Sequence, residues 1–157
     1  MPAATIKYLG LHVGSKLNWK DYIIKKWKQI DLWPKELYWL LGRKSYLSVD
    51  NKFLLYKSII APIWTCGIEL WGCACKSNIT VIQRCQSKIL RAIVNAPWYV
   101  NNDMLHKDLG IPTVQEVIHE RSIKHCTDLE SHSNPLLQPL PWDNVIRRLK
   151  RWWSADL

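Results

Sequence analysis

Residues 78–94 read NITVIQRCQSKILRAIV and carry the most regular pattern in the chain. Apolar side chains recur every three or four residues, which is the period of a helix with one buried face. Arg84, Lys88 and Arg91 follow at i, i+4 and i+7 on the opposite side of the helical wheel. The segment therefore predicts an amphipathic helix whose apolar arc comprises Ile79, Ile82, Ile89 and Ile93.

The basic side of this helix has two interpretations. A solvated charged face is the usual meaning of such a stripe, but acidic residues then normally interleave with the basic ones. No acidic residue lies between Arg84 and Arg91. We therefore predict that Arg84, Lys88 and Arg91 contact nucleic-acid phosphates, with the plain solvated face as the alternative.

The chain before this helix also has a helical pattern. Apolar stripes predict one helix after Asn18 and a second one capped by Ser48. Pro34 and Pro62 should each break or kink their helix, because proline has no N–H to donate. Gly42 is expected to end the first helical region as a C′ residue. The stripes comprise Ile23, Trp27 and Ile30, then Val49, Phe53, Tyr56 and Ile60.

The two ends of the chain differ from this central part. Residues 5–14, TIKYLGLHVG, alternate apolar and polar side chains and predict a short strand or hairpin bent at Gly10. Beyond the basic helix we expect a short helix that stops at Gly110, and then a longer one opened by the capping-box pair Thr113 and Glu116. The fold class is mainly α: a helical bundle preceded by a short β-strand or hairpin.

The sequence divides into four parts. Residues 1–16 form the β element and 17–130 the helical domain, while the proline-bearing stretch 131–142 is a linker and 143–157 a basic C-terminal helix. A length of 157 residues suits one domain with a single core, and it excludes a complete polymerase, kinase or large synthetase.

The net charge indicates which class of partner the chain binds, and the cysteine content indicates its cellular compartment. The formal net charge is +9, from 22 Lys and Arg against 13 Asp and Glu, which favours an anionic polymer as partner, although solubility alone is the plain alternative. No apolar run is long enough for a signal-peptide core or a membrane span. The five cysteines predict reduced thiols in the cytoplasm or nucleus, with Cys66, Cys73 and Cys85 as small core residues.

No catalytic or metal site is expected in this chain. Polymerase chemistry needs clustered carboxylates that hold paired metal ions, and no two acidic residues are adjacent. Cys73 and Cys75 form Cys-x-Cys, which is not the spacing of a zinc knuckle.

Eight strings of sequence resemble a known family. Their order and spacing are similar to the C-terminal end of reverse transcriptases from non-LTR retrotransposons, in particular the jockey type, from about Ile6 to Leu157. The strings are KYLG (7–10), LNWK (17–20), YWLLGRKS (38–45), LLYK (54–57), PIWTCGIELWG (62–72), QRCQSK (83–88), NAPWYV (95–100) and GIPTV (110–114).

The resemblance implies a role in holding a template–primer duplex of RNA and DNA. The helices would form a thumb that contacts the duplex through Arg84, Lys88 and Arg91. A second contact zone on this thumb would comprise Lys25, Lys28, Arg43 and Lys44. The strand before the helices would be similar to a primer grip, formed by Lys7, Tyr8, Leu9 and Gly10.

The resemblance also places the catalytic palm, with its Mg²⁺ ions, before residue 1. We therefore expect this chain to lack cofactors of its own and to be inactive alone as an RNA-directed DNA polymerase, with the palm region as a further partner and no membrane. The alternative is a stand-alone basic helical module derived from a retroelement, whose Trp-rich surface binds another protein.

Overall fold

The structure is a computed structural model that describes residues 5–8, 10–14, 19–134 and 136. The prediction of a mainly helical chain with a short β element in front is confirmed. The C-terminal helix over 143–157, most of the linker 131–142 and Leu9 lie outside the described residues. The elements are β1 (Thr5–Tyr8), β2 (Leu11–Gly14), α1 (Lys20–Glu36), α2 (Tyr38–Leu41), α3 (Val49–Leu55), the π-helical turn η1 (Tyr56–Ile60), α4 (Ala61–Thr65), α5 (Ile68–Trp71), α6 (Lys76–Val94), α7 (Asn102–Leu109) and α8 (Val114–Glu130).

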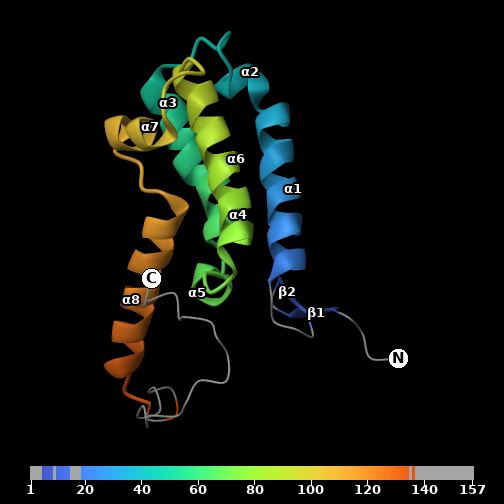
Figure 1. The fold of residues 1–157 in the computed structure, drawn as a ribbon, viewed down its shortest axis with the longest axis vertical. Coiled ribbons are helices and arrows are strands. Elements are labelled where there is room, and N and C mark those ends of the chain that lie inside the picture. The colour runs from blue at the N-terminus through green and yellow to red at the C-terminus, as the bar shows by residue number, and fades with distance from the viewer. Residues whose placement is uncertain (1–4, 9, 15–18, 135, 137–157) are drawn as a thin grey trace.

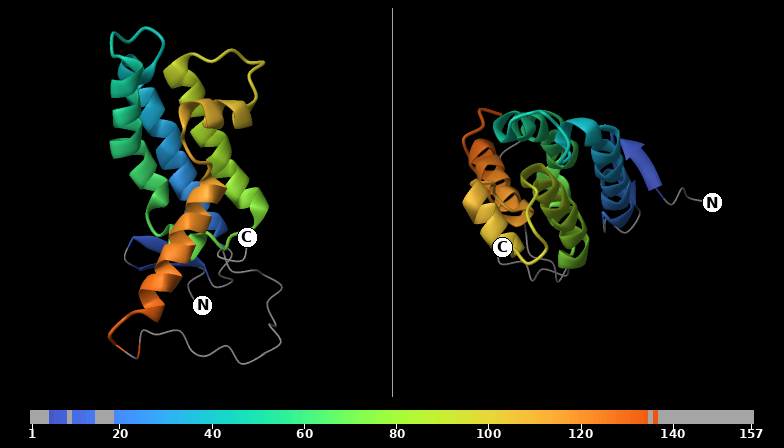
Figure 2. Two further views of the ribbon diagram at one scale, coloured as in Figure 1. Left: turned by 90° about the vertical axis from the view of Figure 1, so that its left-hand side faces the viewer. Right: turned by 90° about the horizontal axis from the view of Figure 1, so that it is seen from above.

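Helix α6 is the centre of the bundle. Helices α1, α3, α7 and α8 all pack against it. α1, α6 and the path α3–η1–α4 extend along the long axis, and the hairpin lies beside the start of α1 (Figure 1). Loops 42–48 and 95–101 lie at the other end of the bundle, as the side view also shows (Figure 2). The molecule therefore has a hairpin end and a loop end.

The hairpin is antiparallel and is attached to the bundle through Leu11. Its register pairs Lys7 with His12 and Tyr8 with Leu11, and Gly10 in the turn has φ +82°. Gly67, between α4 and α5, has φ +67°, and a Cβ at this position would lie 2.8 Å from Cδ2 of Leu11. Glycine is therefore required at position 67 both for the backbone conformation and for the close approach of the hairpin.

The first helical region departs from the expected boundaries. Helix α1 continues past Pro34 and ends two residues later, at Glu36. Pro34 has no N–H to donate to the carbonyl four residues earlier, but it lies so close to the end of the helix that few helical hydrogen bonds follow it. Helix α2 ends directly before Gly42, as expected, but Gly42 is its C-cap and not the C′ residue, with an extended backbone at φ −71° and ψ 172°. Glycine is needed here because a Cβ would collide with the carbonyl oxygen of Tyr38. The buried Lys52 donates from Nζ to the Gly42 carbonyl at 3.0 Å and so ties α3 to this turn.

The second helical region begins as predicted and then changes its hydrogen-bond register. The Ser48 side chain accepts from the Asn51 N–H at 3.3 Å and caps α3. In η1 the N–H of Ala61 bonds to the carbonyl of Tyr56, five residues earlier. This wide turn directly precedes Pro62 at the start of α4, where a proline is tolerated.

The apolar face of α6 forms the middle of the core. All four predicted isoleucines are buried, and each contributes about 2 kcal/mol of hydrophobic stabilisation. Cys85 is also buried, but Cys66 is exposed and Cys73 half-buried, so their assignment to the core was wrong. At position 66 the fold uses the backbone instead: its carbonyl accepts from the hydroxyl of Tyr22 at 2.9 Å and from Nε1 of Trp71 at 3.3 Å.

A network of neutral hydrogen bonds joins α6 to α7 and α8; we call it the α6–α7–α8 junction. Nδ1 of the buried His106 lies 2.9 Å from the carbonyl oxygen of Ile111, which makes Nδ1 the protonated nitrogen. Nε2 then accepts from Nε2 of Gln83 at 3.0 Å. Oε1 of Gln83 accepts from the N–H of Val114 at 2.7 Å. One glutamine side chain thus positions the start of α8.

The capping box predicted at the start of α8 is present. The Thr113 N–H donates to the Glu116 carboxylate at 2.6 Å, and the Glu116 N–H donates to the Thr113 hydroxyl at 3.3 Å. The hydrogen bond from the Thr113 backbone, together with that from its hydroxyl, lowers the pKa of the Glu116 carboxyl.

Candidate nucleic-acid interface

Helices α1 and α6 lie side by side and run in the same direction (Figure 1). Nζ of Lys88 lies 3.4 Å from Oδ1 of Asp31, which places these two residues at the same level of the pair. Arg84 precedes Lys88 by one helical turn, and Lys28 precedes Asp31 by nearly one turn, so both belong to the level below. Lys28, Arg84 and Lys88 are all exposed. The structure thus brings one residue of the predicted second zone beside two residues of the first.

Asp31 supplies the acidic group that α6 lacks. Its carboxylate also contacts Nζ of Lys35 at 2.6 Å. The hydrogen bond from Lys35, supported by that from Lys88, lowers the pKa of Asp31. The absence of acids along α6 itself is correct, but the fold places a carboxylate from α1 beside its basic stripe. We define the α1–α6 face as Lys28, Asp31, Lys35, Arg84 and Lys88.

A groove of about 390 Å³ lies along this face. Its apolar lining comes from both helices, and burial raises the pKa of the Cys85 thiol there. The charged side chains of Asp31, Lys35 and Lys88 also line it. A groove with cationic edges suits a polyanion that lies along the two helices. The remaining lining residues are Ile30, Tyr38, Cys85, Ile89 and Ala92.

A second group of cations lies where the hairpin meets α1. Nζ of Lys25 lies 3.1 and 3.2 Å from the two ring nitrogens of His12. Lys7 is the cross-strand partner of His12. Desolvation, together with the positive charges of Lys25, Lys7 and Lys26, lowers the pKa of His12. We call Lys7, His12, Lys25 and Lys26 the hairpin cluster. Sequence analysis missed His12, although its pairing with Lys7 follows from a two-residue turn.

The other predicted primer-grip residues and the loop cations lie apart from one another. Tyr8 and Gly10 are exposed on the hairpin. Arg43 and Lys44 are exposed in the loop between α2 and α3, at the loop end. The helix axis from Lys25 to Glu36 alone extends about 17 Å at 1.5 Å per residue. The structure therefore places Lys25 and the two loop cations toward opposite ends of α1.

Arg91 is engaged with its own chain. Its Nη1 donates to the carbonyl of Pro97 at 3.0 Å, and its Nη2 donates to the carbonyl of Val100. Asn102 Oδ1 accepts from Nη2 at 2.8 Å and from Nε at 3.1 Å. The guanidinium thus holds the loop between α6 and α7, a role that helical spacing could not indicate.

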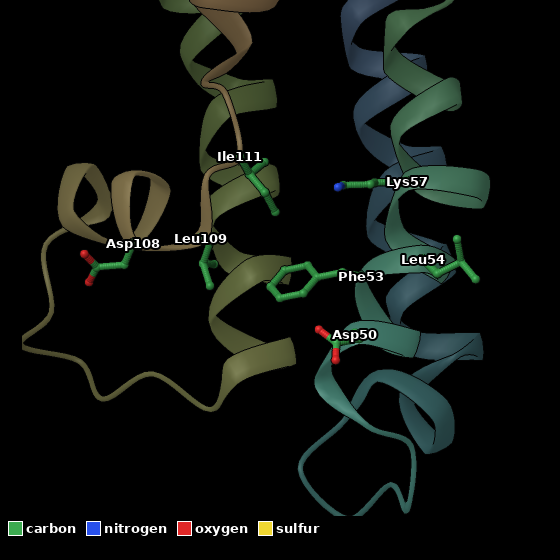
Figure 3. A pocket seen from close by; sticks show the side chains of 7 residues that line it. All are labelled: Asp50, Phe53, Leu54, Lys57, Asp108, Leu109 and Ile111. Carbon is green, nitrogen blue, oxygen red and sulfur yellow. The ribbon is translucent and has the colours of Figure 1, made fainter.

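A second pocket, of about 450 Å³, separates α3 from α7 (Figure 3). Phe53 and Leu109 lie toward its interior, Asp50 lies on the α3 side, and Asp108 lies on the α7 side with its carboxylate directed away from Phe53. With Asp50 and Asp108 against the single ammonium of Lys57, the lining lacks the net positive charge that favours a phosphate. None of the predicted site residues lines it, and it is separate from the α1–α6 face.

The described part of the chain contains no group of three or more His, Cys, Asp or Glu side chains that could hold a metal ion. Among the same residues, no helix combines the length and the apolar character that a membrane crossing requires.

Comparison with known proteins identifies close similarity to retrotransposon polymerases. The chain is 37% identical over 151 residues to the probable RNA-directed DNA polymerase from transposon X-element of Drosophila melanogaster, a match that covers 96% of this chain and 17% of that protein. It is 36% identical over 145 residues to the probable RNA-directed DNA polymerase from transposon BS of the same species, covering 92% of this chain and 16% of that protein.

A third relative is the RNA-directed DNA polymerase from mobile element jockey of Drosophila funebris, 33% identical over 160 aligned residues, covering 96% of this chain and 18% of that protein. The chain thus spans about a sixth of the length of these curated relatives. No family model matches it, and no solved structure matches it significantly. Over nearly its whole length, the chain is homologous to the RNA-directed DNA polymerases of jockey-type non-LTR retrotransposons and corresponds to one segment of those proteins.

Proposed function

We propose that this chain is the thumb-like segment of an RNA-directed DNA polymerase and holds the template–primer duplex along the α1–α6 face. The observation that carries the proposal is the alignment of Lys28, Arg84 and Lys88 across two parallel helices, all exposed, with Asp31 as their nearby acid. The names of the relatives, all RNA-directed DNA polymerases, support nucleic acid as the polyanion.

A bound phosphate can replace Asp31 as the partner of Lys88 and Lys35. Surface ion pairs contribute at most about 1 kcal/mol, so a phosphate can take the place of the Asp31 carboxylate. Each phosphate that is neutralised releases counterions, which makes the binding sensitive to salt and insensitive to sequence. Such a face binds the phosphates of a duplex and makes no base-specific contacts, as a polymerase that copies any template requires.

The hairpin cluster forms the second contact in this proposal. Lys7 and Lys25 converge on His12, and a phosphate placed among them would relieve their mutual repulsion. The cluster lies at the hairpin end, beside the start of α1 (Figure 1). This position fits a primer-grip-like role for Lys7 and Tyr8 next to the duplex that the thumb holds.

The chemistry of polymerisation is assigned to none of the described residues. The described residues offer no carboxylate cluster for the Mg²⁺ ions that polymerases use, so the donor set does not fit that cofactor. In this proposal a palm region elsewhere in the polymerase supplies the reaction. Its contact with this chain would use the exposed Ile6 of β1. A duplex partner also favours a nuclear or cytoplasmic location.

The test compares two triple variants with the same change in net charge. Lys28→Ala/Arg84→Ala/Lys88→Ala removes three cations of the α1–α6 face, and Lys107→Ala/Arg121→Ala/Lys124→Ala removes three exposed cations of α7 and α8. Affinity for an RNA–DNA duplex is measured over a series of salt concentrations. The slope of log K against log salt is negative. We expect the first variant to reduce its magnitude by about two to three, and the control to reduce it by less than one.

Equal slopes for the two variants would show that the α1–α6 face is an ordinary solvated surface and would favour the protein-binding alternative. Arg91→Ala extends the test to the remaining predicted contact. A slope lowered by about one would assign Arg91 to a phosphate, whereas an unchanged slope would leave it as the residue that holds the loop.

A further inference from the structure

The loop of residues 95–101 presents two aromatic side chains that neither the core nor the α1–α6 face uses. Trp98 is 89% exposed and Tyr99 is 72% exposed. Their rings pack edge to face, with centroids 6.0 Å apart and planes inclined at 80°. In this arrangement each ring supports the other while most of its surface remains open to solvent.

The loop has a defined conformation that is fixed by its neighbours. Asn95 ends α6 in the left-handed region with φ 52°. The guanidinium of Arg91 then bridges the carbonyls of Pro97 and Val100, on either side of the two aromatic residues. Asn101 caps α7 by accepting from the Asp103 N–H. Because the loop is held in place before any ligand arrives, little ordering is required when the rings bind.

The position of the loop continues the path of the α1–α6 face. From Lys88 to Asn95 the helix axis advances about 10 Å at 1.5 Å per residue, and the aromatic loop begins there. The loop of residues 42–48, with the exposed Arg43, Lys44 and Tyr46, lies at the same end of the bundle (Figures 1 and 2). Neither loop contains an acidic residue. A strand that follows Arg84 and Lys88 toward the loop end therefore reaches the level of the aromatic loop.

We propose that Trp98 and Tyr99 form a stacking platform for unpaired bases of a single strand that extends from the bound duplex. The inference rests on the proposed duplex binding and adds a second ligand, the bases themselves. Every base has a flat π-face, so stacking on Trp or Tyr needs no particular sequence. Arg91 is a positioning residue in this site, because it acts through the loop that it holds.

The experiment measures the affinity of the full chain for three probes: a blunt RNA–DNA duplex, the same duplex with an oligothymidine extension, and the same duplex with an abasic extension of equal length. The abasic strand keeps the phosphates and removes the rings. We expect the thymidine extension to tighten binding by roughly 5- to 150-fold for each stacked base. We expect the abasic extension to give much less.

Two double variants separate stacking from simple apolar contact. Trp98→Leu/Tyr99→Leu keeps an apolar surface and should abolish the gain from the bases, while the blunt-duplex affinity and its salt slope stay unchanged. Trp98→Phe/Tyr99→Phe keeps flat rings and should retain most of the gain. Both pairs of substitutions are at exposed positions, and thermal unfolding serves as the check that the fold is intact.

Three results would overturn the inference while duplex binding stands: no gain from the thymidine extension, an equal gain from the abasic extension, or a gain that survives in the leucine variant. The first would exclude base binding at the aromatic loop, the second would point to phosphate contacts, and the third would point to simple apolar contact without stacking. If the blunt duplex does not bind at all, the proposed function fails, and free oligothymidine compared between the leucine and phenylalanine variants still decides the stacking site.

Discussion

The α1–α6 face and the α6–α7–α8 junction use the same helix in opposite ways. At the junction, Gln83 and His106 are joined through short, directed hydrogen bonds between neutral groups. On the face, Lys88 and Lys35 contact Asp31 through exposed ion pairs. Buried neutral networks are costly to disrupt, whereas exposed ion pairs exchange readily with solvent and ligands. The junction is therefore suited to holding the fold, and the face to holding a partner.

The largest effect that would sharpen this comparison is expected at Gln83. Gln83→Leu removes the acceptor of the Val114 N–H, which is left unsatisfied, and the nearer donor to the His106 ring, whose Nε2 keeps only the Ser87 hydroxyl at 3.4 Å. We expect the free energy of unfolding in urea to fall by about 2–4 kcal/mol. Gln115→Leu, at an exposed position of α8, serves as the control and should change it by less than about 0.5 kcal/mol. Equal effects would remove the distinction between junction and surface.

A smaller effect is expected at Asp31, where a substitution should increase duplex affinity and leave stability nearly unchanged. Asp31→Asn frees Lys35 and Lys88 and removes a negative charge from the path of the phosphates. Affinity for an RNA–DNA duplex should rise about fivefold, close to 1 kcal/mol, with little change in stability. Glu120→Gln on α8 makes the same change in net charge and should leave the affinity nearly unchanged. Weaker duplex binding by the Asp31 variant would contradict the proposed face.

The smallest effect concerns the hairpin cluster and its dependence on pH. In the free protein, desolvation and the charges of Lys25, Lys7 and Lys26 lower the pKa of His12 below its ordinary value of 6.5. A bound phosphate favours the protonated ring, so binding takes up a proton and strengthens as pH falls from about 7 through the pKa of the complex. We expect a gain of about twofold, smaller than that of the Asp31 variant, because a single ring takes up the proton.

His12→Gln should remove this dependence on pH and leave the salt response of the α1–α6 face intact. Duplex affinity measured across the same pH range checks both statements. If the variant retains the full dependence on pH, His12 is not near a phosphate, and the hairpin cluster is not part of the interface.

Much of the fold could be predicted because its signals are local. The isoleucine spacing of α6, the cap at Ser48 and the capping box at Thr113 each depend on residues within a few positions of one another. The errors arise where backbone groups decide. Gly42 is needed because a Cβ would collide with the Tyr38 carbonyl, although the backbone of Gly42 is extended. Cys66 contributes its carbonyl, which no side-chain pattern can show.

The candidate site was predictable only in its composition. Arg84 and Lys88 could be assigned to the polar side of α6 from spacing alone, and both are exposed. The pairing of Lys88 with Asp31 joins residues that are 57 positions apart, so no local pattern could reveal it. Arg91 occupies the same stripe as Lys88, yet its guanidinium meets the carbonyls of a loop that folds back over the end of α6. The predicted contacts to nucleic acid stay predictions until the salt series is measured.

The sequence by itself determined which segments are helical, which faces are apolar and which polymerases the chain is similar to, because these depend on short-range periodicity and on matched strings of residues. Only the tertiary structure decided which charges are available to a partner. Helix packing set Asp31 beside Lys88, separated Lys25 from Arg43, and fixed Trp98 and Tyr99 on a tethered loop. The physical reason is that a side chain's partners are set by distance in space, and packing brings together groups that the sequence keeps far apart.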